Sequence, residues 1–201
     1  AASARLGTDA AFEVGQMKIG RRLAIKILNA SKFALSFSEG GDIVLDGSLV
    51  TEPIDRAMLA GLADVVDSAT AGLDRYDHTR ALEDAETFFW TFCDDYLELV
   101  KDRAYADGAA EVGSEAVSAR VALALALDTL LRLFAPVLPF ATEEVWSWWH
   151  KESIHTAPWP TSGELRAASA GATLAGLTNP GHALAVLRKL KSEAKASMKT
   201  P

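Results

Sequence analysis

The sequence predicts an all-α fold, an antiparallel bundle of about four long helices followed by a small C-terminal segment. Apolar residues recur at steps of three and four through most of the 201 residues, which is the period of an amphipathic helix. Short segments that contain glycine or proline separate these stretches, and short connections favour helices that run up and down beside one another. Apolar residues make up 49% of the chain, enough to bury a sizeable core.

The ends of the long helices are marked by helix-breaking and helix-starting residues. The four helices are expected at residues 16–37, 51–76, 79–105 and 114–134. Gly40 and Gly41 end the first helix, and Gly108 ends the third. Pro53 stands in the first turn of the second helix, where its missing N–H costs nothing.

The third helix carries the clearest core stripe. Its large side chains repeat at helical steps, at Leu82, Phe89, Phe92, Tyr96 and Leu99. We interpret this stripe as core, and Cys93 beside it as a small buried hydrophobe. The neighbouring Asp94 and Asp95 point about 100° apart on a helix, so we expect surface or capping charges and no catalytic pair.

The chain after the fourth helix is expected to form a smaller unit. Two prolines in PVLPF force a turn, after which Thr142 caps a short helix. We place the helical-bundle domain at residues 1–150 and a C-terminal extension at 151–201. The extension is expected to hold a short extended segment, a mobile linker over 161–181 and a terminal basic helix.

Composition argues against several classes of site. One cysteine excludes an intrachain disulfide, and four scattered histidines predict no metal site. The longest apolar run is broken by Asp128 and Arg132 and is too short to span a bilayer. The first residues do not resemble a signal peptide, which together with the low cysteine content favours the cytoplasm. No nucleophile lies in a recognisable pattern with a base, so no catalytic residue is predicted.

Charge is segregated along the chain, although the net charge is −7. Residues 1–38 carry six Lys or Arg and two acids, and residues 165–201 carry six and one. The segment between them carries eight and twenty-four. A polyanion responds to the local field, so two basic ends make a nucleic-acid partner plausible. The alternative is chance clustering on solvated faces.

The first helix concentrates its positive charge on one face. At 100° per residue, its cations and Asn29 share a stripe roughly 140° wide. The cations are Lys18, Arg21, Arg22, Lys26 and Lys32. Like charges four residues apart repel one another, and no acid occurs between Glu13 and Glu39 to offset them. A bound polyanion would compensate for this repulsion.

Phe33 and Asn29 add groups that recognise unpaired bases. Phe33 falls inside the basic stripe, where an aromatic ring suits base stacking worth roughly 1–3 kcal/mol per base. The Asn29 amide is suited to reading a base edge. The alternative is that Phe33 packs beneath another helix, since Ile25 also falls in the stripe.

Several motifs resemble one family. GTDAAFEVGQMKIGRRLAIKILNASKF resembles the start of the anticodon-binding domain of valyl-tRNA synthetases, and WTFCDDYLELVKDR resembles a later helix of that domain. LLRLFAPVLPFATEEVWSWW is similar to a proline turn shared by several class I synthetases, and SIHTAPWP to the short extended segment that closes the domain. The resemblance covers about residues 3–160, and its opening stretch indicates the valyl branch, with the isoleucyl branch second.

The resemblance implies that an anticodon loop packs against the first helix. Base contacts are then expected from Asn29, Lys32 and Phe33, and phosphate contacts from Lys18, Arg21, Arg22 and Lys26. His155 and Trp159 match the closing segment and are expected to be structural.

The resemblance also bounds the activity. The family's ATP-binding motifs H-I-G-H and K-M-S-K-S do not occur in this chain, so we expect a non-catalytic fragment without a cofactor. The parent valine-tRNA ligase would use ATP. The expected partners are the tRNA anticodon stem-loop and the parent's catalytic domain, with no membrane, and the chain is expected to be a monomer. The alternatives are an isoleucyl-type parent, or a structural helical module that supports a catalytic domain without reading RNA.

Overall fold

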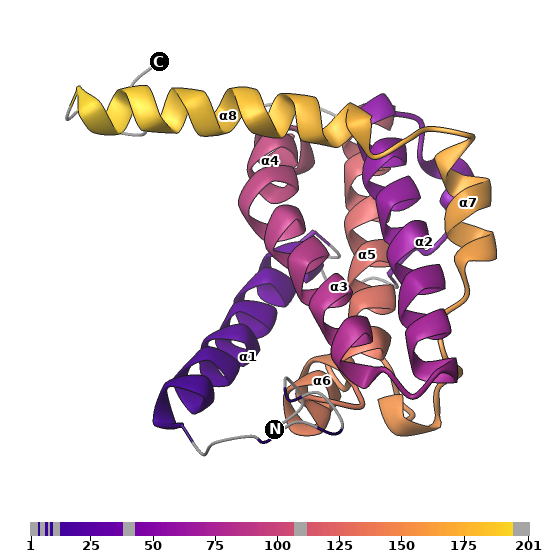
Figure 1. Ribbon diagram of the computed structural model, residues 1–201. Coiled ribbons are helices and arrows are strands. Elements are labelled where there is room, and N and C mark those ends of the chain that lie inside the picture. The colour runs from indigo at the N-terminus through magenta and orange to yellow at the C-terminus, as the bar shows by residue number, and fades with distance from the viewer. Residues whose placement is uncertain are drawn as a thin grey trace.

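The computed structural model describes residues 4, 7, 9, 13–37, 43–106 and 112–194. Within them every regular element is helical, which confirms the predicted all-α class (Figure 1). The helices are α1 (Val14–Leu35), α2 (Pro53–Asp74), α3 (His78–Thr91), α4 (Leu97–Tyr105), α5 (Ser114–Phe134), α6 (Pro139–Trp146), α7 (Ser162–Ser169) and α8 (Ala175–Glu193). Three shorter helical turns are η1 (Gly47–Leu49), η2 (Phe92–Tyr96) and η3 (Ile154–Thr156). None of these described helices is long and apolar enough to cross a membrane.

The core lies where α2, α3 and α5 pack side by side (Figure 1). The third predicted helix appears as one rod, made of α3, the π-helical turn η2 and α4. Phe89, Phe92 and Tyr96 of the predicted stripe are buried in the core. Leu82 and Leu99 are partly buried and pack against it, so the stripe is confirmed as core.

Cys93 is buried beside this stripe, with 4% of its surface exposed. Burial raises the pKa of its thiol to about 12. We therefore predict that Ellman's reagent will not modify the folded chain at pH 8, because only about one thiol in ten thousand is ionised. In denaturant the same thiol should react fully. Rapid stoichiometric reaction of the folded chain would contradict the burial.

A buried carboxylate joins α2 to α4 and α5. The Asp55 side chain is fully buried and accepts two hydrogen bonds from the Arg103 guanidinium, at 2.6 and 2.8 Å. The Tyr96 hydroxyl donates to the same carboxylate at 2.8 Å, and the Ser118 hydroxyl donates at 2.6 Å. Burial, and then the charge of Asp55, raises the pKa of Tyr96 well above its ordinary value, so its hydroxyl stays protonated as a donor.

The structure corrects the mobile linker predicted over 161–181. Residues 162–169 form α7, whose Leu165 and Ala168 are buried, and α7 packs along α2. The small residues that suggested mobility instead allow close packing, because a Cβ at Gly176 would lie 2.8 Å from the Ala57 Cβ. The terminal helix consequently begins at Ala175, earlier than predicted. Its predicted end near 198 lies outside the described residues.

The segment after α5 is held by its polar side chains. Thr142 lies inside α6 and does not cap it, because the helix already begins at Pro139. Glu143 accepts hydrogen bonds from the Ser153 hydroxyl and the Ile154 N–H, both at 2.9 Å. The Trp159 indole N–H donates to the Thr70 hydroxyl at 2.9 Å. These bonds fix residues 153–159 against α6 and α2.

Candidate nucleic-acid interface

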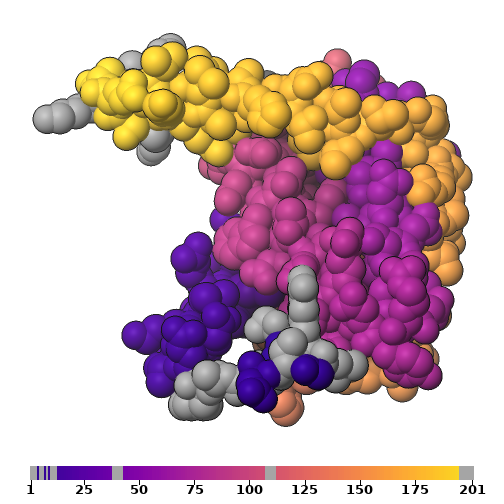
Figure 2. Space-filling view, viewed as in Figure 1, coloured from indigo at the N-terminus to yellow at the C-terminus, as the bar shows by residue number. Residues whose placement is uncertain are grey.

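Two helices project from the bundle and flank a recess. Figure 1 shows α1 leaning away from the other helices, while α8 crosses the opposite end and extends past them. Figure 2 shows the hollow between α1 and α8, with the α3–α4 rod at its back. We call this hollow the recess.

The attachment of α1 to the bundle is uneven. Leu23, Ile27 and Ala34 are buried in the core, on the side of the helix that meets α5 and α6. The first turns are solvated, since Val14 is 56% exposed and Met17 62% exposed. The opposite side of the helix therefore remains open along its length.

Four of the predicted site residues are exposed on that open side. They are Lys18, Arg21, Asn29 and Lys32. Their side chains have no hydrogen bond or ion pair with any residue that the structure describes. Ile25 lies among them and is 47% exposed, so the open side combines cations and an amide with one aliphatic surface. A solvated site of this composition is free to receive an anion.

Arg22 and Lys26 are instead engaged by the α3–α4 rod. The Arg22 guanidinium lies 5.4 Å from the centre of the Trp90 ring, and the Lys26 ammonium lies 5.7 Å from it. The Lys26 ammonium also pairs with the Asp94 carboxylate at 3.0 Å. Cation–π contacts of this kind contribute about 0.5–1 kcal/mol each at exposed sites. The edge of the basic stripe formed by Arg22 and Lys26 therefore faces the rod, and this part of its charge holds α1 in place.

Phe33 lies in an aromatic cluster with Phe37 and Tyr105. The Phe33 ring is half-buried and meets the other two edge to face, at centroid distances of 5.2 and 5.8 Å. Phe37 and Tyr105 are 5.3 Å apart, which closes the cluster. The geometry thus favours the alternative in which Phe33 packs against another helix.

The turn η2 is in contact with both projecting helices. Asp94 pairs with Lys26 of α1, while the Asp95 carboxylate lies 3.9 Å from the guanidinium of Arg188 on α8. Arg188 also donates a hydrogen bond to the Asp94 carbonyl at 2.8 Å. The two carboxylates thus point to different helices. This agrees with the prediction that they do not form a catalytic pair.

Sequence reasoning missed Trp90, Asp94 and Arg188 as parts of this region. Trp90 and Asp94 are four residues apart, so they lie on one side of the rod. A helical wheel shows this shared side but not which helix will lie against it. Ile25, by contrast, falls within the stripe on the wheel, and the structure shows it exposed there.

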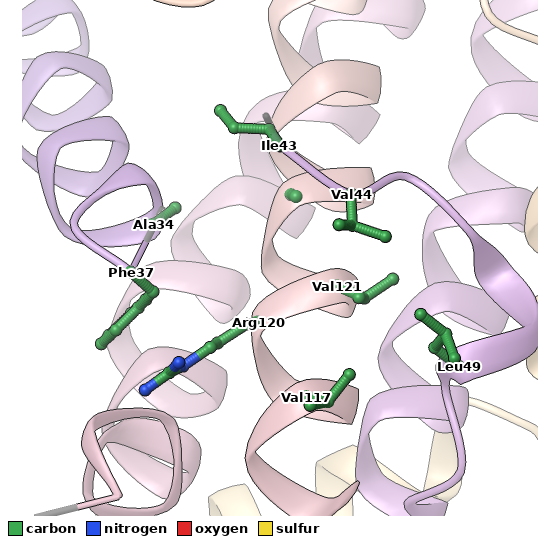
Figure 3. A pocket seen from close by; sticks show the side chains of 9 residues that line it. Ala34, Phe37, Ile43, Val44, Leu49, Val117, Arg120 and Val121 are labelled. Atoms are coloured by element: carbon green, nitrogen blue, oxygen red, sulfur yellow. The ribbon is translucent and has the colours of Figure 1, made fainter. Parts of the chain in front are cut away.

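A separate apolar pocket of about 180 Å³ lies between the end of α1, η1 and α5. Figure 3 shows Phe37 and Arg120 on one side of it and Val121 and Leu49 on the other. The Arg120 guanidinium lies over the Phe37 ring and donates to the Ala104 carbonyl, which leaves an almost wholly aliphatic lining. None of the described residues that line this pocket is an acid or base suited to catalysis.

Comparison with known proteins assigns the chain to a family. Residues 55–201 match the family model described as the anticodon-binding domain of tRNA ligase. The chain is 60% identical over 199 residues to the valine–tRNA ligase of Thermobifida fusca, covering 99% of the chain and 22% of that protein. It is 58% identical over 204 residues to that of Leifsonia xyli, covering 100% of the chain and 23% of the relative. The chain thus spans less than a quarter of these relatives.

A solved structure has the same fold. The ternary complex of Agrobacterium radiobacter K84 agnB2 LeuRS with tRNA and LeuAMS aligns with a TM-score of 0.58 and 18% identity. The alignment covers 78% of this chain and 18% of that one. At this identity the match shows the fold alone. With the family model spanning α2 to the C-terminal helix, the chain belongs to the anticodon-binding domain family of tRNA ligases.

Proposed function

We propose that this chain binds the anticodon stem-loop of a tRNA as part of a valine–tRNA ligase. The observation that carries the proposal is the open side of α1, where Lys18, Arg21, Asn29 and Lys32 are exposed. The helix that carries them flanks the recess (Figure 2). Membership of the anticodon-binding family supports the choice of ligand, and identity with valine–tRNA ligases supports the valine branch over the isoleucine branch.

The roles follow from the chemistry of each side chain. Lys18 and Arg21, with the charge left on Arg22 and Lys26, would hold backbone phosphates, which position RNA without specifying its sequence. Asn29 and Lys32 would meet the unpaired bases, where an amide distinguishes one base edge from another. Ile25 adds an aliphatic surface against which a base or ribose can pack.

Phe33 has a mixed role in this proposal. Its exposed edge is near the base-contacting residues, but its ring also holds α1 against Tyr105. An alanine there would disturb the position of α1 together with any base contact. A substitution at Asn29 is therefore the better test of base recognition, because it leaves the aromatic contacts that position α1 in place.

The chemistry is assigned to the parent ligase. In the proposed arrangement the parent attaches valine to tRNA using ATP at a catalytic domain outside this chain, in the cytoplasm. This chain contributes recognition and needs neither a cofactor nor a metal. A monomer suffices, because the open side of α1 belongs to one copy.

Replacement of Asn29 by alanine is predicted to reduce anticodon discrimination. The loss of one hydrogen bond, worth about 0.5–1.5 kcal/mol, should lower the affinity ratio between valine and swapped anticodons by about two- to tenfold. Fluorescence anisotropy with two stem-loops that differ only in the anticodon measures the ratio. Gln16→Ala, which removes another exposed amide from α1, is the matched control and should leave the ratio unchanged.

The proposal fails if the unaltered chain binds both stem-loops equally at every salt concentration. The rival structural function has one observation in its favour, the exposed apolar side chains in the first turns of α1, among them Val14, Met17 and Ile19. These side chains suit a protein contact. If NMR shifts on adding the stem-loop avoid α1 altogether, the structural module becomes the better description.

A further inference from the structure

Lys26 differs from the other cations of the basic stripe because it has a carboxylate partner. Its ammonium lies 3.0 Å from the carboxylate of Asp94, which is on η2 and 68 residues further along the chain. Lys18, Arg21 and Lys32 have no such partner in the part of the chain that the structure describes. One cation of α1 is therefore matched with an anion before any ligand binds.

The pair between Lys26 and Asp94 is open to solvent. The Lys26 side chain is 35% exposed and the Asp94 side chain 54% exposed. Water screens an ion pair of this kind, so the pair adds little to stability and can be exchanged for another. A phosphate that approaches Lys26 is attracted by the ammonium and repelled by the carboxylate beside it. The phosphate and Asp94 are thus rivals for one cation.

Asp94 is held in place from the side opposite α1. Arg188 on α8 donates a hydrogen bond to the Asp94 carbonyl at 2.8 Å. Gly181 packs against the same turn so closely that a Cβ there would lie 2.9 Å from the Asp95 carboxylate. Tyr96, at the end of η2, is fully buried. Because the turn is fixed by these contacts, the negative charge stays beside α1 when a ligand arrives.

The helix α1 keeps most of its anchorage without this ion pair. Leu23 and Ile27 are buried in the core. The Arg22 guanidinium lies over the Trp90 ring at 5.4 Å, and the Trp90 indole N–H donates to the Glu86 carboxylate at 3.3 Å, which steadies the ring. These contacts remain when the charge of η2 is removed, so the pair can be tested without releasing α1.

We infer that Asp94 competes with the RNA backbone for Lys26 and thereby limits the affinity of the chain for the anticodon stem-loop. The inference rests on the proposed function and adds a residue that tunes it. In the unbound chain the carboxylate stands where a phosphate would bind. Because phosphate contacts carry no sequence information, this competition lowers the affinity for every anticodon alike and leaves discrimination to the base contacts.

The test is Asp94→Asn, assayed against the valine anticodon stem-loop over a salt series. Asparagine removes the charge and keeps the backbone carbonyl that Arg188 binds. One further phosphate contact should steepen the slope of log K against log salt by about 0.7–0.9 and tighten binding about five- to eightfold at 0.1 M salt. The ratio of affinities for valine and swapped anticodons should stay unchanged. If Asp94 served only to hold α1, its loss would weaken binding instead.

The matched control is Asp74→Asn, which removes an exposed carboxylate from the end of α2, outside α1 and the rod. This variant should keep the slope of the unaltered chain. A double-mutant cycle with Lys26→Gln identifies the cation concerned. Alone, Lys26→Gln should leave the slope nearly unchanged, and combined with Asp94→Asn it should remove the whole gain. Circular dichroism establishes that every variant is folded before binding is compared.

The outcomes separate the two claims. If the unaltered chain reads the anticodon but Asp94→Asn binds no more tightly than the control, the competition is wrong and the proposed function stands. If Asp94→Asn gains the same affinity in the presence of Lys26→Gln, the gain follows net charge and the inference is again wrong. If the unaltered chain shows no salt-dependent binding, both claims fall together.

Discussion

Replacing Asp55 with asparagine should lower the free energy of unfolding by about 3–5 kcal/mol, a large part of the 5–15 kcal/mol typical of a domain. Asparagine keeps the size of the side chain but removes the charge that Arg103 requires. Its amide group would also place a donor where Arg103, Tyr96 and Ser118 all donate. Urea unfolding followed by circular dichroism measures the loss.

The matched control is Asp64→Asn, which removes a carboxylate from an exposed pair. Asp64 on α2 lies 3.0 Å from the Arg166 guanidinium, and its side chain is 67% exposed. Exposed pairs contribute about 0–1 kcal/mol, so this variant should unfold almost as the unaltered chain does. If the two substitutions lowered the free energy of unfolding equally, the burial of Asp55 would not be the reason for the loss of stability.

Replacing Lys18, Arg21 and Lys32 together with glutamine should weaken binding to the valine anticodon stem-loop on the order of 100-fold at 0.1 M salt. Lys18 and Arg21 are the expected phosphate contacts, and each one lost removes about 0.7–0.9 from the slope of log K against log salt, so the two remove about 1.4–1.8. Loss of the Lys32 base contact weakens binding further. None of the three side chains has a partner among the residues that the structure describes, so stability should change little. Filter binding over a salt series measures the slope.

A second triple variant separates a local effect from general loss of charge. Arg75, Arg80 and Lys151 are exposed cations outside α1 and α8, and their replacement by glutamine removes the same total charge. This variant should keep most of the affinity. A slope reduced as much as in the α1 variant would mean that binding follows net charge and that the open side of α1 is not the site.

Local sequence patterns predicted the helices well, because each helix is set by its own caps and periodicity. The boundaries of α5 match the prediction at Ser114 and Phe134. The wheel also placed Leu23, Ile27 and Ala34 together, and these residues are buried. The family resemblance, drawn from motifs on α1, the rod and α6, agrees with the family that the comparisons show.

Contacts between distant helices could not be predicted in this way. Lys26 and Asp94 are 68 residues apart, and no local pattern indicates that they meet. The wheel left open whether Phe33 stacks on a base or packs beneath another helix, because Tyr105, whose ring it contacts, comes from another helix. The segment that forms α7 was misjudged for a related reason, since small residues suit both a flexible linker and a close helix contact. In this chain the small residues form a helix contact because α2 lies beside them, and the local sequence does not show that neighbour.

The π-helical turn η2 sets the register of the rod. A π-turn holds one more residue than an α-turn, so it shifts the following residues by about 100° around the axis. Before the turn, the rod presents Trp90 to α1, and after it, Arg103 reaches Asp55. Deleting a single residue from η2 would keep the rod helical but rotate its second half by about 100° relative to its first half. Either Trp90 would then face α1 or Arg103 would reach Asp55, but not both. The extra residue thus allows one continuous helix to contact both α1 and Asp55. A regular α-helix of the same sequence could be oriented for one of these contacts but not for both.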